Sequence, residues 1–363
     1  MGVFRRTYGC AAAILAAIVL ASTWTTVAFA QGTTNYAAAL IKLEVTSPAK
    51  FGGPTKPAPA AKHVKVAVIS SSQQLQGDVD EAIGVAKAAK LIGWPERTFD
   101  GQGDTTTQNT QIANAVTWGA KLIILDAVNT ATVQAGIAIA KKAGVVVIPS
   151  NGSAVGDISV NTTTIGQYMG GWIIDNSKGT ANALILGDKE FTGSTAGPEK
   201  AESMLQACST CTVGPLMWFT YSDVASNLGP EVVSYLRTNP SVNYVLVPYD
   251  PAVPAVATAL QGAGMASRVQ IVSNLGDAQN LQYIQAGTIE HADLAWDNQY
   301  IGFAALDQGI RKLDHLPASK PNGENVPFRL LTSSNLGQVS KYPNGWVAPY
   351  SYSKAFVKLW TRK

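Results

Sequence analysis

The fold is indicated most clearly by residues 121–150, which have the sequence KLIILDAVNTATVQAGIAIAKKAGVVVIPS. Two short apolar runs, 121–126 and 145–150, enclose a segment with the apolar spacing of a helix, 130–143, which ends at Gly144. Both runs are apolar at nearly every position, which is typical of strands buried on both faces of a sheet. The segment therefore predicts a β-α-β unit with parallel strands.

The same alternation of strands and helices extends in both directions along the chain. A first set of units ends near residue 150, and a second begins near residue 166. Further strands are expected at 64–70, 95–99, 181–186, 212–217, 244–248, 269–273, 289–295 and 327–331. Further helices are expected at 78–92, 107–118, 166–176, 198–207, 223–236, 254–262, 278–284, 300–313 and 353–360. Two sets of units predict an α/β protein with two Rossmann-like lobes rather than one very wide sheet.

The first thirty residues have the features of a cleaved export signal. Arg5 and Arg6 precede an apolar run, 11–21, that is too short to span a bilayer. Small residues at Ala28 and Ala30 then occupy the positions that signal peptidase recognises. We expect cleavage after Ala30 and a periplasmic mature protein, and the alternative is an uncleaved membrane anchor.

The segment after the signal, 31–62, is expected to be an N-terminal extension and linker, because its second half is punctuated by Pro and Gly and lacks an apolar period. Without the two signal arginines the net charge falls from +3 for the whole chain to about +1. This balance excludes a strongly basic nucleic-acid-binding protein.

Two cysteines remain after the signal, Cys208 and Cys211, and they are separated by Ser and Thr. In an exported protein this spacing favours a small structural disulfide. The alternative is a redox centre, which would place the first Cys at the start of a helix, whereas this pair follows the predicted helix 198–207. A metal site is not expected, because the three His residues are far apart in the sequence.

Polar residues follow the predicted strands in both sets. Because ligands of open α/β sheets bind beyond the carboxyl ends of the strands, these residues are candidates for a binding site. Each one alone could instead be a turn or helix-capping residue. The candidates are Ser72, Gln73, Gln74, Asp126, Asn129, Ser150 and Asn151 in the first set, and Asp188, Lys189, Glu190, Tyr249, Asp250 and Asn274 in the second.

Four stretches carry a resemblance to a known family: 84–94, 107–125, 138–148 and 292–302. In these stretches the chain resembles the type I periplasmic binding proteins, the ribose- and galactose-binding group that supplies ABC importers. The resemblance implies two Rossmann-like lobes with parallel sheets, joined by a three-strand hinge, with the ligand in the cleft between them. It places residues 63–165 and 301–332 in the first lobe, and 166–300 and 333–363 in the second.

The resemblance also implies which residues contact the ligand. First-lobe contacts are expected at Gln73, Gln74, Asp126, Ser150 and Asn151, second-lobe contacts at Glu190, Asp250 and Asn274, and a hinge-side contact at Tyr300. Tyr249 and Trp296 are expected to offer flat faces on which a ligand can stack. Phe191 and Trp218 could do the same, or they could be aromatic residues of the core. The chain lacks the arginines that ribose-type members carry after the fourth strand and between 188 and 198. A sugar held by charged bidentate bonds is therefore not expected.

The expected function is closure on a small polar ligand, sugar or sugar-like, and its delivery to an ABC permease in the membrane by a monomer without cofactors. The alternative is the ligand-binding component of a chemosensory or two-component signalling system, which would use the same cleft. Enzymatic activity is not expected, because the Gly-Ser-Thr-Ala-Gly stretch at 193–197 lacks the spacing of a nucleophile elbow.

Overall fold

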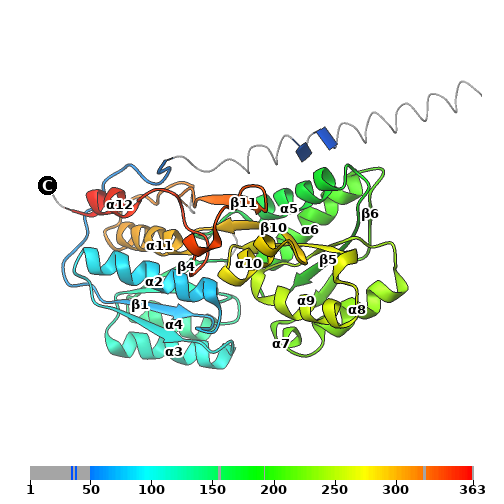
Figure 1. Cartoon of the computed structure of the whole chain (residues 1–363). Coiled ribbons are helices and arrows are strands. Elements are labelled where there is room, and N and C mark those ends of the chain that lie inside the picture. The colour runs from blue at the N-terminus through cyan, green and yellow to red at the C-terminus, as the bar shows by residue number, and fades with distance from the viewer. Residues whose placement is uncertain are drawn as a thin grey trace, which may run out of the picture.

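The computed structural model describes residues 34–35, 37–38, 50–153, 157–191, 193–321 and 324–361. Within them the chain forms two α/β lobes that lie side by side (Figure 1), which confirms the predicted fold class. The predicted export signal, 1–30, lies outside the described residues. In the described part of the chain, no helix combines the length and the apolar character needed to cross a membrane.

The first lobe is built on a four-stranded parallel sheet with the order β2-β1-β3-β4. Its strands are β1 (Val66–Ser70), β2 (Glu96–Asp100), β3 (Leu122–Asp126) and β4 (Val146–Ser150). Its helices are α2 (Gln76–Leu91), α3 (Thr105–Trp118), α4 (Gln134–Lys142) and α11 (Asn298–Leu313). Alternate strand residues face opposite layers: Leu122 and Ile124 pack towards α2 and α11, and Ile123 and Leu125 towards α3 and α4. Helices therefore cover both faces of the sheet, as the apolar strands predict.

The second lobe contains a larger sheet with the order β11-β10-β9-β8-β5-β6, and β7 also pairs with β5. All of its pairs are parallel except β10 with β11. The strands are β5 (Asn182–Asp188), β6 (Thr212–Val213), β7 (Met217–Phe219), β8 (Tyr244–Leu246), β9 (Gln270–Leu275), β10 (Glu290–Trp296) and β11 (Phe328–Thr332). The helices are α5 (Thr162–Asn176), α6 (Gly193–Ala207), α7 (Tyr221–Val224), α8 (Leu228–Thr238), α9 (Val253–Gly262) and α10 (Ala278–Ala286). Helices α5 and α6 approach each other so closely that a Cβ atom at Gly166 would overlap with the carbonyl oxygen of Gly197. The absence of a side chain at Gly166 allows this approach.

Two predicted elements are each divided into two in the structure. The predicted strand 212–217 forms β6 and β7, which are separated by residues 214–216. Pro215 lies in this break, and proline has no backbone N–H to donate to a sheet. The predicted helix 223–236 forms α7 and α8, and Pro230 lies in the first turn of α8, where proline is tolerated because the backbone N–H groups there have no partner within the helix.

The chain passes between the lobes between β4 and α5 and between β10 and α11, near two of the predicted boundaries. It also passes between α11 and β11, which were predicted to belong to the same lobe. A further passage follows β11, because the last helix, α12 (Ser353–Trp360), packs against α2 and α11 of the first lobe (Figure 1). The predicted lobe boundaries therefore need correction near the C-terminus. β11 belongs to the second sheet, and α12 belongs to the first lobe.

Aromatic packing explains the position of α12. Trp360 stacks on Phe303 of α11 with a centroid distance of 6.1 Å, and its Nε1 donates a hydrogen bond to Asp307 at 2.7 Å. The predicted N-terminal linker contributes as well, since the backbone N–H groups of Ala58 and Ala60 donate to carbonyl oxygens of α12. The described part of the linker and α12 thus form one layer over the first lobe.

Candidate functional site

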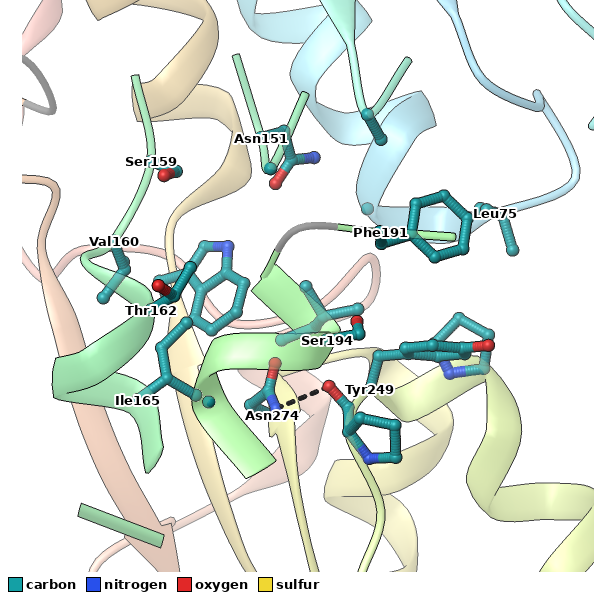
Figure 2. A pocket seen from close by; sticks show the side chains of 18 of the residues that line it. Leu75, Asn151, Ser159, Val160, Thr162, Ile165, Phe191, Ser194, Tyr249 and Asn274 are labelled. Carbon is teal, nitrogen blue, oxygen red and sulfur yellow. Dashed lines mark hydrogen bonds between the residues drawn. The ribbon is translucent and has the colours of Figure 1, made fainter. Parts of the chain in front are cut away.

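A cleft between the two lobes is the candidate binding site. The empty space between its walls is about 850 Å³, a figure that includes open solvent. Residues of the first lobe lie on one side of it and residues of the second lobe on the other (Figure 2). The strand ends of both sheets contribute, as expected for an α/β fold. The first lobe and its connection supply Leu75, Gly77, Asp78, Ala127, Asn151, Gly152, Ser159 and Val160, and the second lobe supplies Thr162, Ile165, Met169, Phe191, Ser194, Gly197, Pro198, Tyr221, Pro248, Tyr249, Pro251, Asn274, Leu275 and Trp296.

Two asparagines face each other across the cleft, Asn151 after β4 and Asn274 in β9 (Figure 2). Asn151 has a φ of 54°, a left-handed conformation that Asn adopts more readily than most residues, and its Nδ2 donates to Asp126 at 3.2 Å. The Nδ2 of Asn274 donates to the carbonyl oxygen of Pro248 at 2.9 Å. Because each amide nitrogen is engaged in this way, each Oδ1 is left to accept a hydrogen bond from a ligand in the cleft.

Aromatic rings form much of the cleft wall. Tyr249 and Phe191 pack edge to face, with centroids 6.0 Å apart, and the Tyr249 hydroxyl donates to Asp188 at 2.7 Å. The indole Nε1 of Trp296 donates to Asn298 at 2.9 Å, so its ring, rather than its N–H, is presented to the cleft. Trp218 is not among the cleft residues and lies instead beneath the ammonium group of Lys189. Such rings offer flat apolar faces against which a small ligand can stack.

Asp78 is the acid of the cleft, and it was not among the predicted contacts. It lies in the first turn of α2, and its Oδ2 accepts hydrogen bonds from the Ser71 hydroxyl at 2.7 Å and the Ser72 backbone at 3.0 Å. Burial raises the pKa of Asp78 to about 6 despite these hydrogen bonds. In the sequence Asp78 is indistinguishable from an ordinary acid that interacts with the helix dipole.

Four of the predicted ligand contacts line the cleft: Asn151, Tyr249, Asn274 and Trp296. The other predicted contacts, Gln73, Gln74, Asp126, Ser150, Glu190, Asp250 and Tyr300, are not among the lining residues. Gln73 and Gln74 belong to the turn after β1, where the Gln73 backbone donates to Asp100 at 3.0 Å and Gln74 is exposed.

Asp126 and Ser150 lie one layer beneath the first-lobe wall. Both are fully buried, and the Ser150 hydroxyl donates to Glu81 at 2.5 Å. Burial and the adjacent Glu81 carboxyl raise the pKa of Asp126 well above its usual range. Asp126 supports Asn151, whose side chain donates to it, so it acts on the cleft through a residue that lines it.

Glu190 lies at the edge of the cleft and contributes to a contact between the lobes. Its backbone oxygen accepts a hydrogen bond from Asn129 of the first lobe at 2.9 Å. Its side chain accepts from the backbone N–H of Tyr221 at 2.6 Å, and Tyr221 lines the cleft. The structure therefore shows the lobes in direct contact beside the cleft.

Asp250 and Tyr300 are buried away from the cleft. Asp250 accepts hydrogen bonds from Ser273 and from the backbone of Asp277 inside the second lobe. Tyr300 belongs to an aromatic cluster with Phe51 and Phe356, and its hydroxyl donates to the backbone of Glu324 at 2.7 Å. The structure places both of these predicted contacts in the interior rather than at the cleft.

Further cleft residues come from α5, α6 and the loop after β8. Ile165 and Met169 face the cleft from α5, and Ser194 does so from α6. Apolar helix residues of this kind have the same spacing whether they face a core or a cleft, so periodicity alone could not identify them.

Cys208 and Cys211 form the predicted disulfide, with a Cα–Cα distance of 5.3 Å. The pair follows α6, the carboxyl end of a helix, as the sequence pattern indicates. The bridge lies outside the set of residues that line the cleft.

Comparisons with known proteins agree with this architecture. The profile of the periplasmic binding protein domain matches residues 66–316 of this chain, and no match is found among curated protein sequences. Similar solved structures include an ABC sugar transporter subunit from Rhodobacter sphaeroides, with 16% identity, a TM-score of 0.66 and coverage of 75% of this chain and 99% of that chain.

Two other similar structures were solved with bound ligands. The myo-inositol binding protein of Caulobacter, bound to myo-inositol, has 17% identity, a TM-score of 0.65 and coverage of 78% of this chain and 99% of that chain. A solute binding protein of Clostridium phytofermentas, with bound L-rhamnose, has 17% identity, a TM-score of 0.64 and coverage of 77% and 99%. The family match spans both lobes and agrees with the expected binding protein rather than an enzyme. This chain belongs to the periplasmic binding protein family.

Proposed function

We propose that this protein is the solute-binding component of an ABC importer and that its lobes close on a small, uncharged molecule with several hydroxyl groups. The observation that carries this proposal is the composition of the cleft. None of the described residues that line it is Lys, Arg or His, and apart from the Asp78 carboxyl its polar side chains carry amides and hydroxyls. An anionic ligand would lose its hydration there without gaining a counter-charge, which costs several kcal/mol.

The neighbouring structures support the same class of ligand. The myo-inositol and L-rhamnose named for two of them are uncharged and polyhydroxylated. Ligands of this kind have hydroxyl hydrogens for the free oxygens of Asn151 and Asn274, and apolar C–H faces for Trp296 and Tyr249. An uncharged ligand also agrees with the absence, after the fourth strand and between 188 and 198, of the arginines that ribose-type members carry.

Closure follows from the position of the two asparagines. Asn151 belongs to the first lobe and Asn274 to the second, so a ligand bonded to both stabilises only the closed arrangement. The Asn129–Glu190 hydrogen bond adds a direct contact between the lobes in that arrangement. The closed monomer then docks on a membrane permease, after export and cleavage of the signal at Ala30.

A thermal-shift screen of uncharged sugars, polyols and cyclitols, with sugar acids and sugar phosphates as counterparts, tests the proposal. A ligand that binds the folded state raises the melting temperature of the wild type, and at a fixed concentration the rise is larger for tighter binding. Asn151→Gly removes one amide and keeps the left-handed backbone unstrained, so we expect it to abolish most of the shift. The matched control is Asn114→Ala, an exposed position on α3. A stabilising hit that is retained in full by Asn151→Gly, or hits confined to the anionic compounds, would contradict the proposal.

A further inference from the structure

Three acids meet inside the second lobe, away from the cleft. Asp250, Glu290 and Asp293 are all completely buried, and one carboxylate oxygen of each lies within 4.8 Å of the other two. No other set of three or more His, Cys, Asp or Glu side chains in the described residues is this close together. This cluster of Asp250, Glu290 and Asp293 is called the buried acid cluster below.

A β-bulge creates the cluster. In the pairing of β10 with β9, Glu290 lies opposite Ile271 and Asp293 lies opposite Ser273, with a shift in register between Glu290 and Ala292. In a regular strand, residues three apart point to opposite faces of the sheet. The extra residue of the bulge instead brings Glu290 and Asp293 onto the same face, and bulges of this kind are often found beside functional sites.

Hydrogen bonds account for only part of the buried acid cluster. The Ser273 hydroxyl lies 2.5 Å from both Asp250 Oδ1 and Glu290 Oε1, and a hydroxyl has one hydrogen to donate. The other oxygen of Glu290 accepts from Asn280 at 2.9 Å. Within the described residues, neither oxygen of Asp293 makes a hydrogen bond of normal geometry, although both are buried, and the polar groups that act on it are the Asp250 carboxyl and the Gly276 backbone. Asp293 is therefore a buried polar side chain that faces the other two carboxyls, and no hydrogen bond of normal geometry satisfies either of its oxygens.

The electrostatic surroundings are acidic. The charged groups that act on these three carboxyls are one another and Asp277, at the N-terminus of α10. Burial, together with this repulsion, raises the pKa of each member well above its usual range. Buried carboxylates that lack a basic partner are stabilised either by retained protons or by a bound cation.

We propose that Asp250, Glu290 and Asp293 form a binding site for one calcium ion, which links the segment after β8 to β10. Two oxygens bound to the same Ca²⁺, each about 2.4 Å from it, can be at most about 4.8 Å apart. One carboxylate oxygen from each of the three acids lies within 4.8 Å of the others, so one ion could contact all three. Magnesium usually keeps several waters in its coordination shell, whereas all three acids here are completely buried. Zinc and copper prefer nitrogen or sulfur ligands, which the cluster lacks.

The ion would also fix one wall of the cleft. Asp250 lies between Tyr249 and Pro251, and both of these neighbours line the cleft. Holding Asp250 to β10 therefore positions the loop that presents the Tyr249 ring. The calcium site does not depend on the identity of the ligand, so either proposal can fail without the other.

The test uses calcium itself as the probe. Because the cluster is fully buried, the full mature chain is unfolded and refolded either with excess CaCl₂ or with EDTA, and free metal is removed by gel filtration. We expect about one bound calcium per chain by atomic emission, and a melting temperature several degrees higher than that of the EDTA sample. Asp293→Asn should lose the retained calcium and make the melting temperature the same in both conditions. Glu231→Gln, an exposed position on α8, is the matched control and should retain it.

If the three carboxyls are instead kept neutral by retained protons, the opposite result is expected. The wild type would then hold no calcium after refolding, its melting temperature would be equal in CaCl₂ and EDTA, and the proposal would be overturned whatever the variants do. If Asp293→Asn does not fold, Glu290→Gln takes its place, and calcium retained in full by a folded cluster variant also overturns the proposal.

Discussion

The buried carboxyl of Glu81 leads to a specific prediction about pH. Glu81 is completely buried on α2, where it accepts a hydrogen bond from Ser150. Burial raises the pKa of Glu81 from its ordinary value of 4.5 to about 8, and the nearby charge of Asp78 adds to this rise. The folded protein therefore keeps a proton on Glu81 over a range of pH in which the unfolded chain has lost it.

The sign and size of the effect follow from this difference. The stabilising contribution of Glu81 is fully present below about pH 4.5 and is lost as the pH rises through about 8. Between these limits, one such group lowers the unfolding free energy by about 1.4 kcal/mol per pH unit, so the loss from pH 5 to pH 8 is about 4 kcal/mol. The raised pKa of Asp126 acts in the same direction.

Urea unfolding followed by circular dichroism, at several values between about pH 5 and about pH 8, measures this dependence. The comparison is between the wild type, Glu81→Gln and Glu199→Gln. Glutamine keeps the oxygen that accepts from Ser150 but cannot titrate, so Glu81→Gln should show a clearly shallower loss of stability with pH. Glu199 is exposed, and its variant should follow the wild type. Equal slopes for the wild type and Glu81→Gln would refute the assignment of a raised pKa to Glu81.

Three other predictions concern the stability of the fold. Gly166→Ala should cost about 3 kcal/mol, because its Cβ would overlap with the backbone of α6, whereas Gly262→Ala, with open space around it, should change stability by less than about 0.5 kcal/mol; equal urea midpoints would contradict this. Trp360→Ala should cost about 3–5 kcal/mol by removing the buried anchor of α12, and a wild-type melting temperature would show that α12 does not stabilise the first lobe. The Cys208–Cys211 bridge closes a very short loop, so its reduction should cost at most about 2 kcal/mol of stability, and complete unfolding on reduction would contradict that value.

The strands and most helices could be predicted from the sequence, because their signals are local. The apolar run 121–126 indicates a buried strand without reference to the rest of the chain, and β3 occupies Leu122–Asp126. The position of α12 could not be predicted in this way. It depends on contacts of Phe356 and Trp360 with Phe51 and Phe303, which are distant in the sequence.

The sequence indicates which loops lie near the candidate site, but it does not indicate which side chains of those loops face the cleft. Asn151 and Asp126 both lie at strand ends, but Asn151 turns towards the cleft while Asp126 is fully buried beneath it. This difference depends on the backbone conformation after each strand, which residue type alone does not fix. The bulge that unites Glu290 and Asp293 is likewise invisible in the sequence pattern, because the two residues are three positions apart.

Calorimetric titration of the mature protein with matched pairs of ligands tests the proposed function most directly. Each pair consists of an uncharged sugar or cyclitol, such as L-rhamnose or myo-inositol, and a phosphorylated or carboxylated counterpart. A cleft that lacks basic side chains predicts binding of the uncharged member of at least one pair, with one site per chain, and at least tenfold weaker binding of its anionic counterpart. Tighter binding of the anionic members, or binding that is unchanged in Asn151→Gly, would contradict the proposed closure of the two lobes on an uncharged, hydroxylated ligand.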